Sequence, residues 1–214
     1  MKAVIAGATG LTGSTLAWEL LARDEFTEIT CLVRNIPGED QKGLVYQQTD
    51  FDMIHFEKFK ADTAFTCLGT TIKNAGSREN FYRVDYHYNF MFAEACKSRG
   101  VERFVLMSAL GADSQSSIFY NRVKGELEEA IINLNFKSLT IVRPSLLEGP
   151  RTESRPGELF ARKAMKLLNP LLIGGLRRYR SVDVDKIASV MAEAAILSCP
   201  GVRIIENEEI LTYR

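Results

Sequence analysis

The sequence has few of the residues that characterise secreted, metal-binding or membrane-spanning proteins. Its 214 residues include four cysteines, none in a C-x-x-C pair, and only two histidines, neither with the spacing of a metal site. We therefore predict reduced cysteines, a cytoplasmic location and no metal. No apolar run reaches the roughly 18 residues of a membrane span, so membrane insertion is not expected. A G-x-S-x-G motif is also absent, which argues against a serine hydrolase.

The formal charge is balanced, because 27 basic residues oppose 27 acidic residues. Such a chain has no long-range field to attract nucleic acid, so a nucleic-acid partner is not predicted. Apolar residues make up 46% of the chain, charged residues 25%, and prolines number only 6. This composition excludes disordered and collagen-like proteins. The length fits a single domain spanning residues 1–214.

Short β-rich segments alternate with longer amphipathic ones in the early part of the chain. This alternation predicts an α/β fold of the Rossmann type, a doubly wound parallel sheet with crossover helices. After Pro144 the sequence becomes turn-rich, and we expect residues 145–180 to form a small carboxyl-terminal cap over the substrate. The expected strands are Lys2–Ala6, Glu28–Val33, Leu44–Gln47, Thr63–Cys67, Phe104–Ser108, Ser138–Arg143 and Val202–Glu206. The expected helices are Leu11–Arg23, Arg78–Ser98, Ser116–Leu134, Leu159–Leu168 and Val184–Leu197.

A glycine-rich motif, GATGLTG, follows the first expected strand and opens the first expected helix. It places Gly7, Gly10 and Gly13 three residues apart, with Thr9 and Leu11 between them. Glycines let the backbone turn sharply and approach a pyrophosphate, whose charge is held by the free N–H groups at the helix start. The motif therefore predicts dinucleotide binding through these five residues; a glycine-rich turn without a ligand is the alternative.

The residues after the second and third strands indicate which dinucleotide binds. Dinucleotide folds that prefer NAD usually carry an acidic residue near the end of the second strand, but Arg34 stands there in CLVRN. Its guanidinium suits a 2′-phosphate, so we predict NADP(H) rather than NAD(H), although a solvated loop charge explains it too. Asp50, followed by Phe51, is placed to meet the adenine end, or serves only as a turn former. Gly69, after the fourth strand, is placed beside the nicotinamide, with Cys67 as a small core residue.

Three polar residues in the second half of the chain suggest catalysis. Ser108 ends the fifth expected strand, and Tyr120 and Lys124 lie four residues apart in the helix that follows. That spacing puts both on one helix face, where the ammonium favours the phenolate form of the tyrosine. Tyr120 could then act as acid or base while Ser108 polarises a carbonyl and Lys124 also holds the nicotinamide ribose. The alternative is that Tyr120 packs on the sheet and Lys124 is a solvated charge.

These motifs, with RPSLLEGPR after the sixth strand, resemble the short-chain dehydrogenase/reductase superfamily. CLGTT, FYNRVKGELE and ESRPGE are similar to its atypical branch typified by the Tat-interacting protein. The resemblance implies a Rossmann fold, bound NADP(H) and Ser108, Tyr120 and Lys124 as the catalytic set. It also implies that Arg34, Arg143 and Pro144 lie near the cofactor. The chain departs from many relatives in reading Asp85 where they have an asparagine, and its substrate-binding region is short, which disfavours nucleotide sugars.

The leading hypothesis is an NADPH-dependent reductase of a small carbonyl compound, or the reverse alcohol oxidation. One alternative is a regulatory protein in which NADP(H) occupancy controls a partner; another is an isomerase with tightly held cofactor. The segment FYRVDYHYNFMF is rich in aromatic residues. Its helix, at residues 78–98, could pack on the sheet with one face and on a second subunit with another, which predicts a homodimer.

Overall fold

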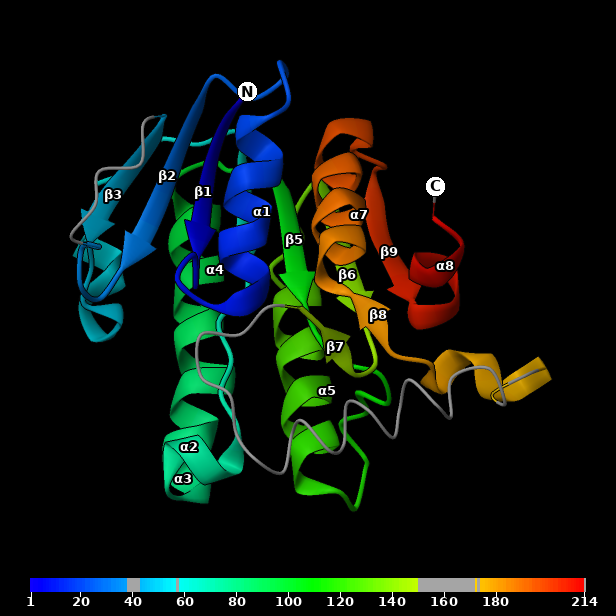
Figure 1. Cartoon of the computed structure of the whole chain (residues 1–214). Helices are drawn as coiled ribbons and strands as arrows, with labels where there is room; N and C mark the ends of the chain where they lie inside the picture. The colour runs from blue at the N-terminus through cyan, green and yellow to red at the C-terminus, as the bar shows by residue number, and fades with distance from the viewer. Residues whose placement is uncertain (38–42, 57, 150–171, 173, 214) are drawn as a thin grey trace.

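The computed structural model describes residues 1–37, 43–56, 58–149, 172 and 174–213. A seven-stranded parallel sheet has the order β3-β2-β1-β4-β5-β6-β9 (Figure 1). Since all neighbours are parallel, the carboxyl ends of the strands meet at one edge, and the order reverses between β1 and β4. The strands are β1 Lys2–Ala6, β2 Glu28–Val33, β3 Leu44–Gln48, β4 Thr63–Thr66, β5 Arg103–Met107, β6 Ser138–Arg143 and β9 Gly201–Glu206.

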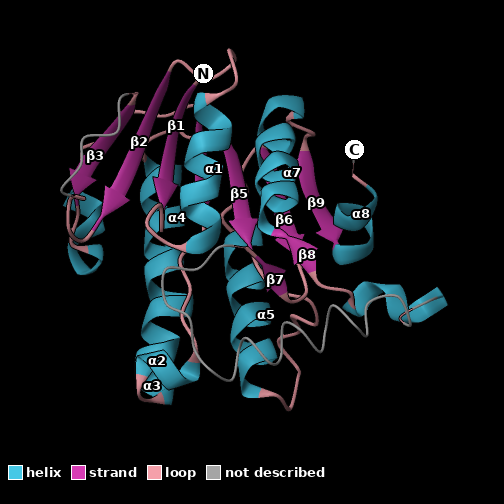
Figure 2. Cartoon of the chain, in the orientation of Figure 1, coloured by secondary structure: helices cyan, strands magenta, loops and turns pink. Residues whose placement is uncertain are grey.

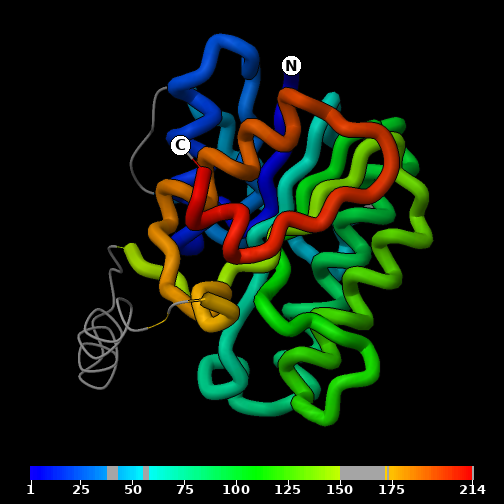
Figure 3. Tube along the Cα trace, turned by 90° about the vertical axis from the view of Figure 1, so that its right-hand side faces the viewer, coloured from blue at the N-terminus to red at the C-terminus, as the bar shows by residue number. Residues whose placement is uncertain are grey.

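Helices cover both faces of this sheet, which makes it a doubly wound Rossmann-type fold (Figure 2). On one face, α1 (Leu11–Leu21) and α7 (Val184–Leu197) pack on alternate residues of the strands, including Ile5 and Val105. On the other face, α4 (Asn89–Ser98) and α5 (Phe119–Ile132) pack on the intervening residues, including Val4 and Phe104. Viewed from the side, the sheet lies between these two helix layers (Figure 3). The central strands are apolar almost throughout because both of their faces are buried.

The predicted fold class is confirmed, and the predicted strands agree with the structure to within one residue at each end. Of the helices, α1 ends two residues earlier than predicted, and α5 spans Phe119–Ile132 rather than Ser116–Leu134. The start of α5 follows from the turns at Asp113 and Ser116, whose side chains accept backbone N–H bonds and leave the segment before Phe119 non-helical.

The helix predicted over residues 78–98 is continuous but is not a uniform α-helix. It consists of α3 (Arg78–Tyr82), a π-helical segment η2 (Arg83–Tyr88) and α4. Asn89 accounts for part of this irregularity, because its side-chain amide donates to the backbone oxygens of Val84 and Asp85, at 3.1 Å each. It also donates to the backbone oxygen of Leu68, at 3.3 Å, which ties the widened turn to the end of β4. Such π segments are rare and occur frequently at functional sites.

The carboxyl-terminal part adds short elements that the sequence patterns did not indicate. These elements are β7 (Leu147–Glu148) and β8 (Val182–Asp183), which pair in parallel, the 3-10 helix η4 (Gly174–Tyr179), and the short helix α8 (Asn207–Thr212) after β9. The expected helix Leu159–Leu168 lies outside the described residues, so the cap over residues 145–180 stays a prediction. Two other short elements lie earlier in the chain, η1 (Phe51–Phe56) and α2 (Ile72–Ala75).

Candidate active site

The glycine motif forms a tight turn between β1 and α1, at the carboxyl edge of the sheet. Gly7 has a φ of +85°, and a Cβ there would lie 2.7 Å from the carbonyl carbon of Cys67. A Cβ on Gly13 would lie 2.1 Å from the backbone oxygen of Gly7. Both positions therefore exclude any side chain. Gly10 differs, because a Cβ there would meet only the Gly7 oxygen, at 3.4 Å; its outer side is open to a ligand.

The start of α1 offers unpaired donors beside this opening. The first intrahelical bond is Ser14 N–H to the Gly10 oxygen, and Gly10 supplies no side-chain cap. The N–H groups of Leu11, Thr12 and Gly13 precede that bond and have no acceptor within the helix. The Thr12 hydroxyl is buried and lacks a hydrogen-bond partner among the described residues. An orphaned buried hydroxyl, free amides and an open glycine together fit the diphosphate of a dinucleotide.

Arg34 lies where the prediction placed it, directly after β2. With Gln48, Thr49 and Asp50 it lines an open hollow of about 520 Å³ beyond the ends of β2 and β3. Its side chain is exposed, while Gln48 donates to its backbone oxygen at 3.1 Å and so joins the two strand ends. The hollow therefore presents a cation on the same edge of the sheet as the glycine turn, which the 2′-phosphate interpretation requires.

The next two predicted cofactor residues have structural roles. The Asp50 side chain accepts from the backbone N–H of Asp52 at 3.0 Å and so begins the turn of η1. The Phe51 ring is buried in the core and packs near Tyr88, with ring centroids 5.8 Å apart. The turn-forming role considered for Asp50 is thus present, and its contact with adenine remains a prediction. Phe51 is not one of the residues that line the hollow, so its predicted cofactor contact remains a prediction.

Lys124 is buried beneath the β4 end of the site. Its side chain is 5% exposed, and its Nζ lies 2.8 Å from an oxygen of Asp85, which is 1% exposed. Burial acts to lower the pKa of Lys124, but the charges of Asp85, Tyr120 and Glu128 outweigh it and raise the pKa above its usual value. A Cβ on Gly69 would lie 3.9 Å from Nζ. The solvated-charge alternative for Lys124 is therefore wrong.

Tyr120 lies one helical turn before Lys124 and is partly buried. Its ring packs against Phe81 of α3, with centroids 5.7 Å apart. The spacing of four residues places its phenol on the same side of α5 as the ammonium, and Tyr120 acts electrostatically on Lys124. The structure thus brings together the glycine turn, the Gly69 loop and the Tyr120–Lys124 pair. Burial raises the pKa of Cys67 to about 12, which agrees with an unreactive core thiol.

Ser108 follows β5 and is buried, but its hydroxyl is not free. It donates to a carboxylate oxygen of Glu128, which is itself buried. A hydroxyl has only one proton to donate, so Ser108 faces the site with acceptor lone pairs. The predicted role of Ser108, which is to donate to a substrate carbonyl, requires its hydroxyl to rotate away from Glu128.

Arg143 completes this buried network. Its Nε lies 3.1 and 3.2 Å from the two oxygens of Glu128, and another nitrogen lies 2.9 Å from Glu206. Hydrogen bonding to Glu128 raises the pKa of Arg143. With its guanidinium occupied, the predicted cofactor contact at Arg143 and Pro144 would come from the backbone of that turn.

Glu128 is a residue of this site that our reading of the sequence missed. It stands four residues after Lys124, on the same face of α5, so the spacing Y-x-x-x-K-x-x-x-E carried a signal. Gly125 was also missed; a Cβ there would lie 2.1 Å from the backbone nitrogen of Ser114. This glycine lets α5 approach the preceding loop closely and fixes where Tyr120 and Lys124 project.

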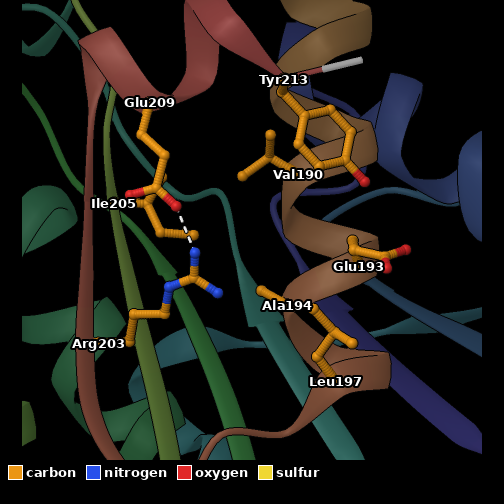
Figure 4. A pocket seen from close by; sticks show the side chains of 8 residues that line it. All are labelled: Val190, Glu193, Ala194, Leu197, Arg203, Ile205, Glu209 and Tyr213. Carbon is orange, nitrogen blue, oxygen red and sulfur yellow. Dashed lines mark hydrogen bonds and ion pairs between the residues drawn. The ribbon is translucent and has the colours of Figure 1, made fainter.

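A second hollow lies elsewhere, between α7, β9 and α8 (Figure 4). Its floor is apolar, an Arg203–Glu209 ion pair crosses it, and none of its lining residues is a predicted site residue. Among the described residues no group of three or more His, Cys, Asp or Glu side chains could hold a metal ion. The described helices also include none with the length and apolar character needed to cross a membrane.

The sequence comparisons agree with this geometry. A family model described as NAD(P)H-binding matches residues 7–195 of the chain. The rat (Rattus norvegicus) protein HTATIP2 is 35% identical over 216 residues, covering 97% of this chain and 86% of the rat protein. The chain belongs to the NAD(P)H-binding family, in the HTATIP2 branch of the atypical short-chain dehydrogenases/reductases. The family resemblance drawn from the motifs is confirmed.

Fungal relatives of this NAD(P)H-binding protein have similar coverage. FMP52-1 of Scheffersomyces stipitis is 36% identical over 83% of this chain and 76% of its own length. FMP52 of Eremothecium gossypii is 33% identical over 99% of this chain and 96% of its own length. Both are named mitochondrial proteins.

Solved structures with low sequence identity share the fold. MoeE5, solved with UDP-glucose and NAD, superposes with a TM-score of 0.72 at 16% identity, covering 99% of this chain and 80% of MoeE5. WbmH of Bordetella bronchiseptica, solved with NAD⁺, gives a TM-score of 0.71 at 16% identity, covering 96% of this chain and 75% of WbmH. These matches show that this NAD(P)H-binding protein has a Rossmann-type fold.

Proposed function

We propose that the protein is an NADP(H)-dependent oxidoreductase that reduces a small carbonyl compound or oxidises the corresponding alcohol. The position of Lys124 carries this proposal. A buried ammonium lies one helical turn after a partly exposed tyrosine and beside the loop at Gly69. That loop continues from Cys67, which packs on the turn at Gly7. A dinucleotide held at the glycine turn would therefore extend toward the Tyr120 phenol.

The residues of the chain would move the proton of this reaction. NADP(H), when bound, would supply or accept the hydride. In reduction the Tyr120 hydroxyl donates its proton to the carbonyl oxygen, and in oxidation the phenolate takes the alcohol proton. Lys124, whose ammonium forms an ion pair with Asp85, would stabilise the phenolate, and its N–H donors would be available to the nicotinamide ribose.

Replacing Tyr120 with Phe tests the assigned chemistry. The ring and its packing on Phe81 remain, while the exchangeable proton is lost. We expect turnover with a panel of aldehydes, ketones and quinones to disappear and NADPH affinity to stay within about twofold, as measured by fluorescence titration. Wild-type rates in the Tyr120→Phe variant would overturn the role of the phenol.

The choice of NADP(H) over NAD(H) rests on Arg34 in its open hollow. A charge-assisted contact to a 2′-phosphate contributes about 1.5–3 kcal/mol. Arg34→Ala should therefore weaken NADPH binding about tenfold to 150-fold and leave NADH binding nearly unchanged. Equal losses for both nucleotides would contradict a 2′-phosphate contact at this residue.

The Ser108–Glu128 hydrogen bond favours a second candidate function. A serine committed to Glu128 does not polarise a carbonyl, which would suit a protein that binds NADP(H) and signals its occupancy to a partner. Cofactor binding without turnover across the same panel, together with a partner that responds to NADPH, would support this regulatory function.

We also propose that α3, η2 and α4 contribute to a homodimer. Tyr82 stacks on Tyr86, and Tyr86 on Phe90, with centroids 4.8 and 6.0 Å apart; these three partly buried rings form an aromatic stripe. Sedimentation at micromolar concentration should show a species of twice 24.0 kDa, and a single 24.0 kDa species would contradict the dimer.

The cytoplasmic location predicted above remains to be tested by cell fractionation, because the fungal relatives are named mitochondrial proteins.

A further inference from the structure

The buried partner of Lys124 is a carboxylate, and it contacts two parts of the site at once. One oxygen of Asp85 lies 2.8 Å from Lys124 Nζ. The other accepts the backbone N–H of Thr70 at 2.9 Å, directly after Gly69. A Cβ on Gly69 would lie 3.4 Å from the first oxygen, so the carboxylate fills the space under this loop. The first oxygen thus has the ammonium as an ion-pair partner but no hydrogen bond of good geometry among the described residues, while the second is hydrogen-bonded to the backbone.

The backbone that presents Asp85 is held in an unusual shape. Asp85 lies within the π-helical segment η2, and its own carbonyl oxygen accepts from the Asn89 side chain at 3.1 Å. The same Asn89 amide donates to the Leu68 oxygen. Together with the bond from Thr70 to Asp85, this gives two hydrogen bonds between the π-helical turn and the segment that follows β4. The position of this carboxylate is thus determined by the fold, independently of Lys124.

We propose that Asp85 is a positioning residue: its carboxylate fixes the Lys124 ammonium below Tyr120 and offsets part of the positive charge that the phenol would otherwise meet. This inference rests on the proposed function, in which Tyr120 exchanges a proton. A positive charge close to a phenol favours the phenolate, and a carboxylate 2.8 Å from the ammonium opposes that effect on the phenol.

Other titratable groups around the pair do not replace this effect. Glu128, on the same face of α5, contributes least among the causes that raise the pKa of Lys124, and it is itself ion-paired with Arg143 and accepts from Ser108. Cys67, at the end of β4, is held in its neutral thiol form because burial raises its pKa to about 12. Phe81, which packs on the Tyr120 ring from α3, carries no charge. Among these neighbours Asp85 alone combines a full charge with direct contact to the ammonium.

The test follows the titration of the Tyr120 phenol by NMR in the full chain, with tyrosine isotope-labelled at Cζ and Tyr120→Phe to assign the signal. We expect Asp85→Asn to lower the midpoint and Lys124→Met to raise it. The double variant, in which the charged pair is absent, should have a midpoint closer to that of the wild type than either single variant has. Glu102→Gln, which breaks an exposed pair with Lys137 of 3.0 Å, is the matched control and should not move it.

An unchanged midpoint in Asp85→Asn, or a shift in the same direction as Lys124→Met, would overturn the inference. If Asp85→Asn does not fold, the double variant still decides, because its midpoint must lie closer to that of the wild type than the midpoint of Lys124→Met does. The limb of the kcat/KM profile that reports Tyr120, the acid limb for alcohol oxidation and the alkaline limb for carbonyl reduction, should move with the midpoint, a change that a merely structural role would not produce. Absence of turnover in the wild type would refute the proposed function alone, since the NMR titration does not need it.

Discussion

Two glycines of the dinucleotide turn have different roles, because Gly13 is needed for stability and Gly10 for binding of the cofactor. A single substitution at each position can show this. In Gly13→Ala the new Cβ would lie 2.1 Å from the Gly7 oxygen and 2.7 Å from the Gly7 carbonyl carbon. Both are backbone atoms, so no side-chain rotation relieves the overlap. Overpacking typically costs about 1–3 kcal/mol, and this rigid case belongs at the upper end. For a chain of this size that corresponds to a fall in Tm of roughly 6–12 °C.

Gly10→Ala should have the opposite profile. Gly10 has φ −79° and ψ 169°, a conformation that alanine adopts readily, and a Cβ there meets only one atom, at 3.4 Å. We expect less than about 1 kcal/mol of destabilisation. The methyl group would, however, occupy the side from which a diphosphate approaches the backbone, so NADPH affinity should fall by about tenfold or more.

Thermal unfolding of the apoprotein and NADPH titration measure the two effects separately. Wild-type and both variants are compared at one pH and ionic strength, because binding itself raises the apparent stability. If Gly10→Ala bound NADPH as tightly as the wild type, the diphosphate would not lie over Gly10. If Gly13→Ala melted at the wild-type temperature, the close approach of Gly13 to Gly7 would be refuted.

Two further predictions concern buried charge and thiol reactivity. Glu128→Ala removes one partner of Arg143 and the acceptor of Ser108. Since Arg143 keeps Glu206, we expect the free energy of unfolding measured in urea to fall by about 3 kcal/mol. A fall below about 1 kcal/mol would show that the network is not stabilising. Cys199 is exposed, whereas burial raises the pKa of Cys31 to about 12. A thiol reagent at mildly alkaline pH should therefore modify Cys199 first, detected by mass spectrometry, and modification of Cys31 in the folded wild type would contradict its burial.

Local sequence patterns were sufficient for the sheet and for the cofactor turn. The strands are short, apolar on both faces and separated by helix-length segments, which only a parallel sheet satisfies. Gly7 needs a positive φ and Gly13 a close backbone contact, and both requirements follow from the immediate neighbours in the chain. The pairing of Tyr120 with Lys124 is equally local, because four residues are one helical turn.

Contacts between distant segments decided what those residues can do. Asp85 and Lys124 are 39 positions apart in the sequence, and they meet because α5 packs against η2. From the sequence alone Ser108 is expected to have a free hydroxyl. In the fold, Glu128, which is held by Arg143, accepts the hydrogen bond of that hydroxyl. The sequence by itself determines the charge and spacing of each residue. The tertiary fold determines which helix face and which strand end lie within a few ångströms of that residue. The groups on those elements decide whether its charge is neutralised and whether its proton is already donated.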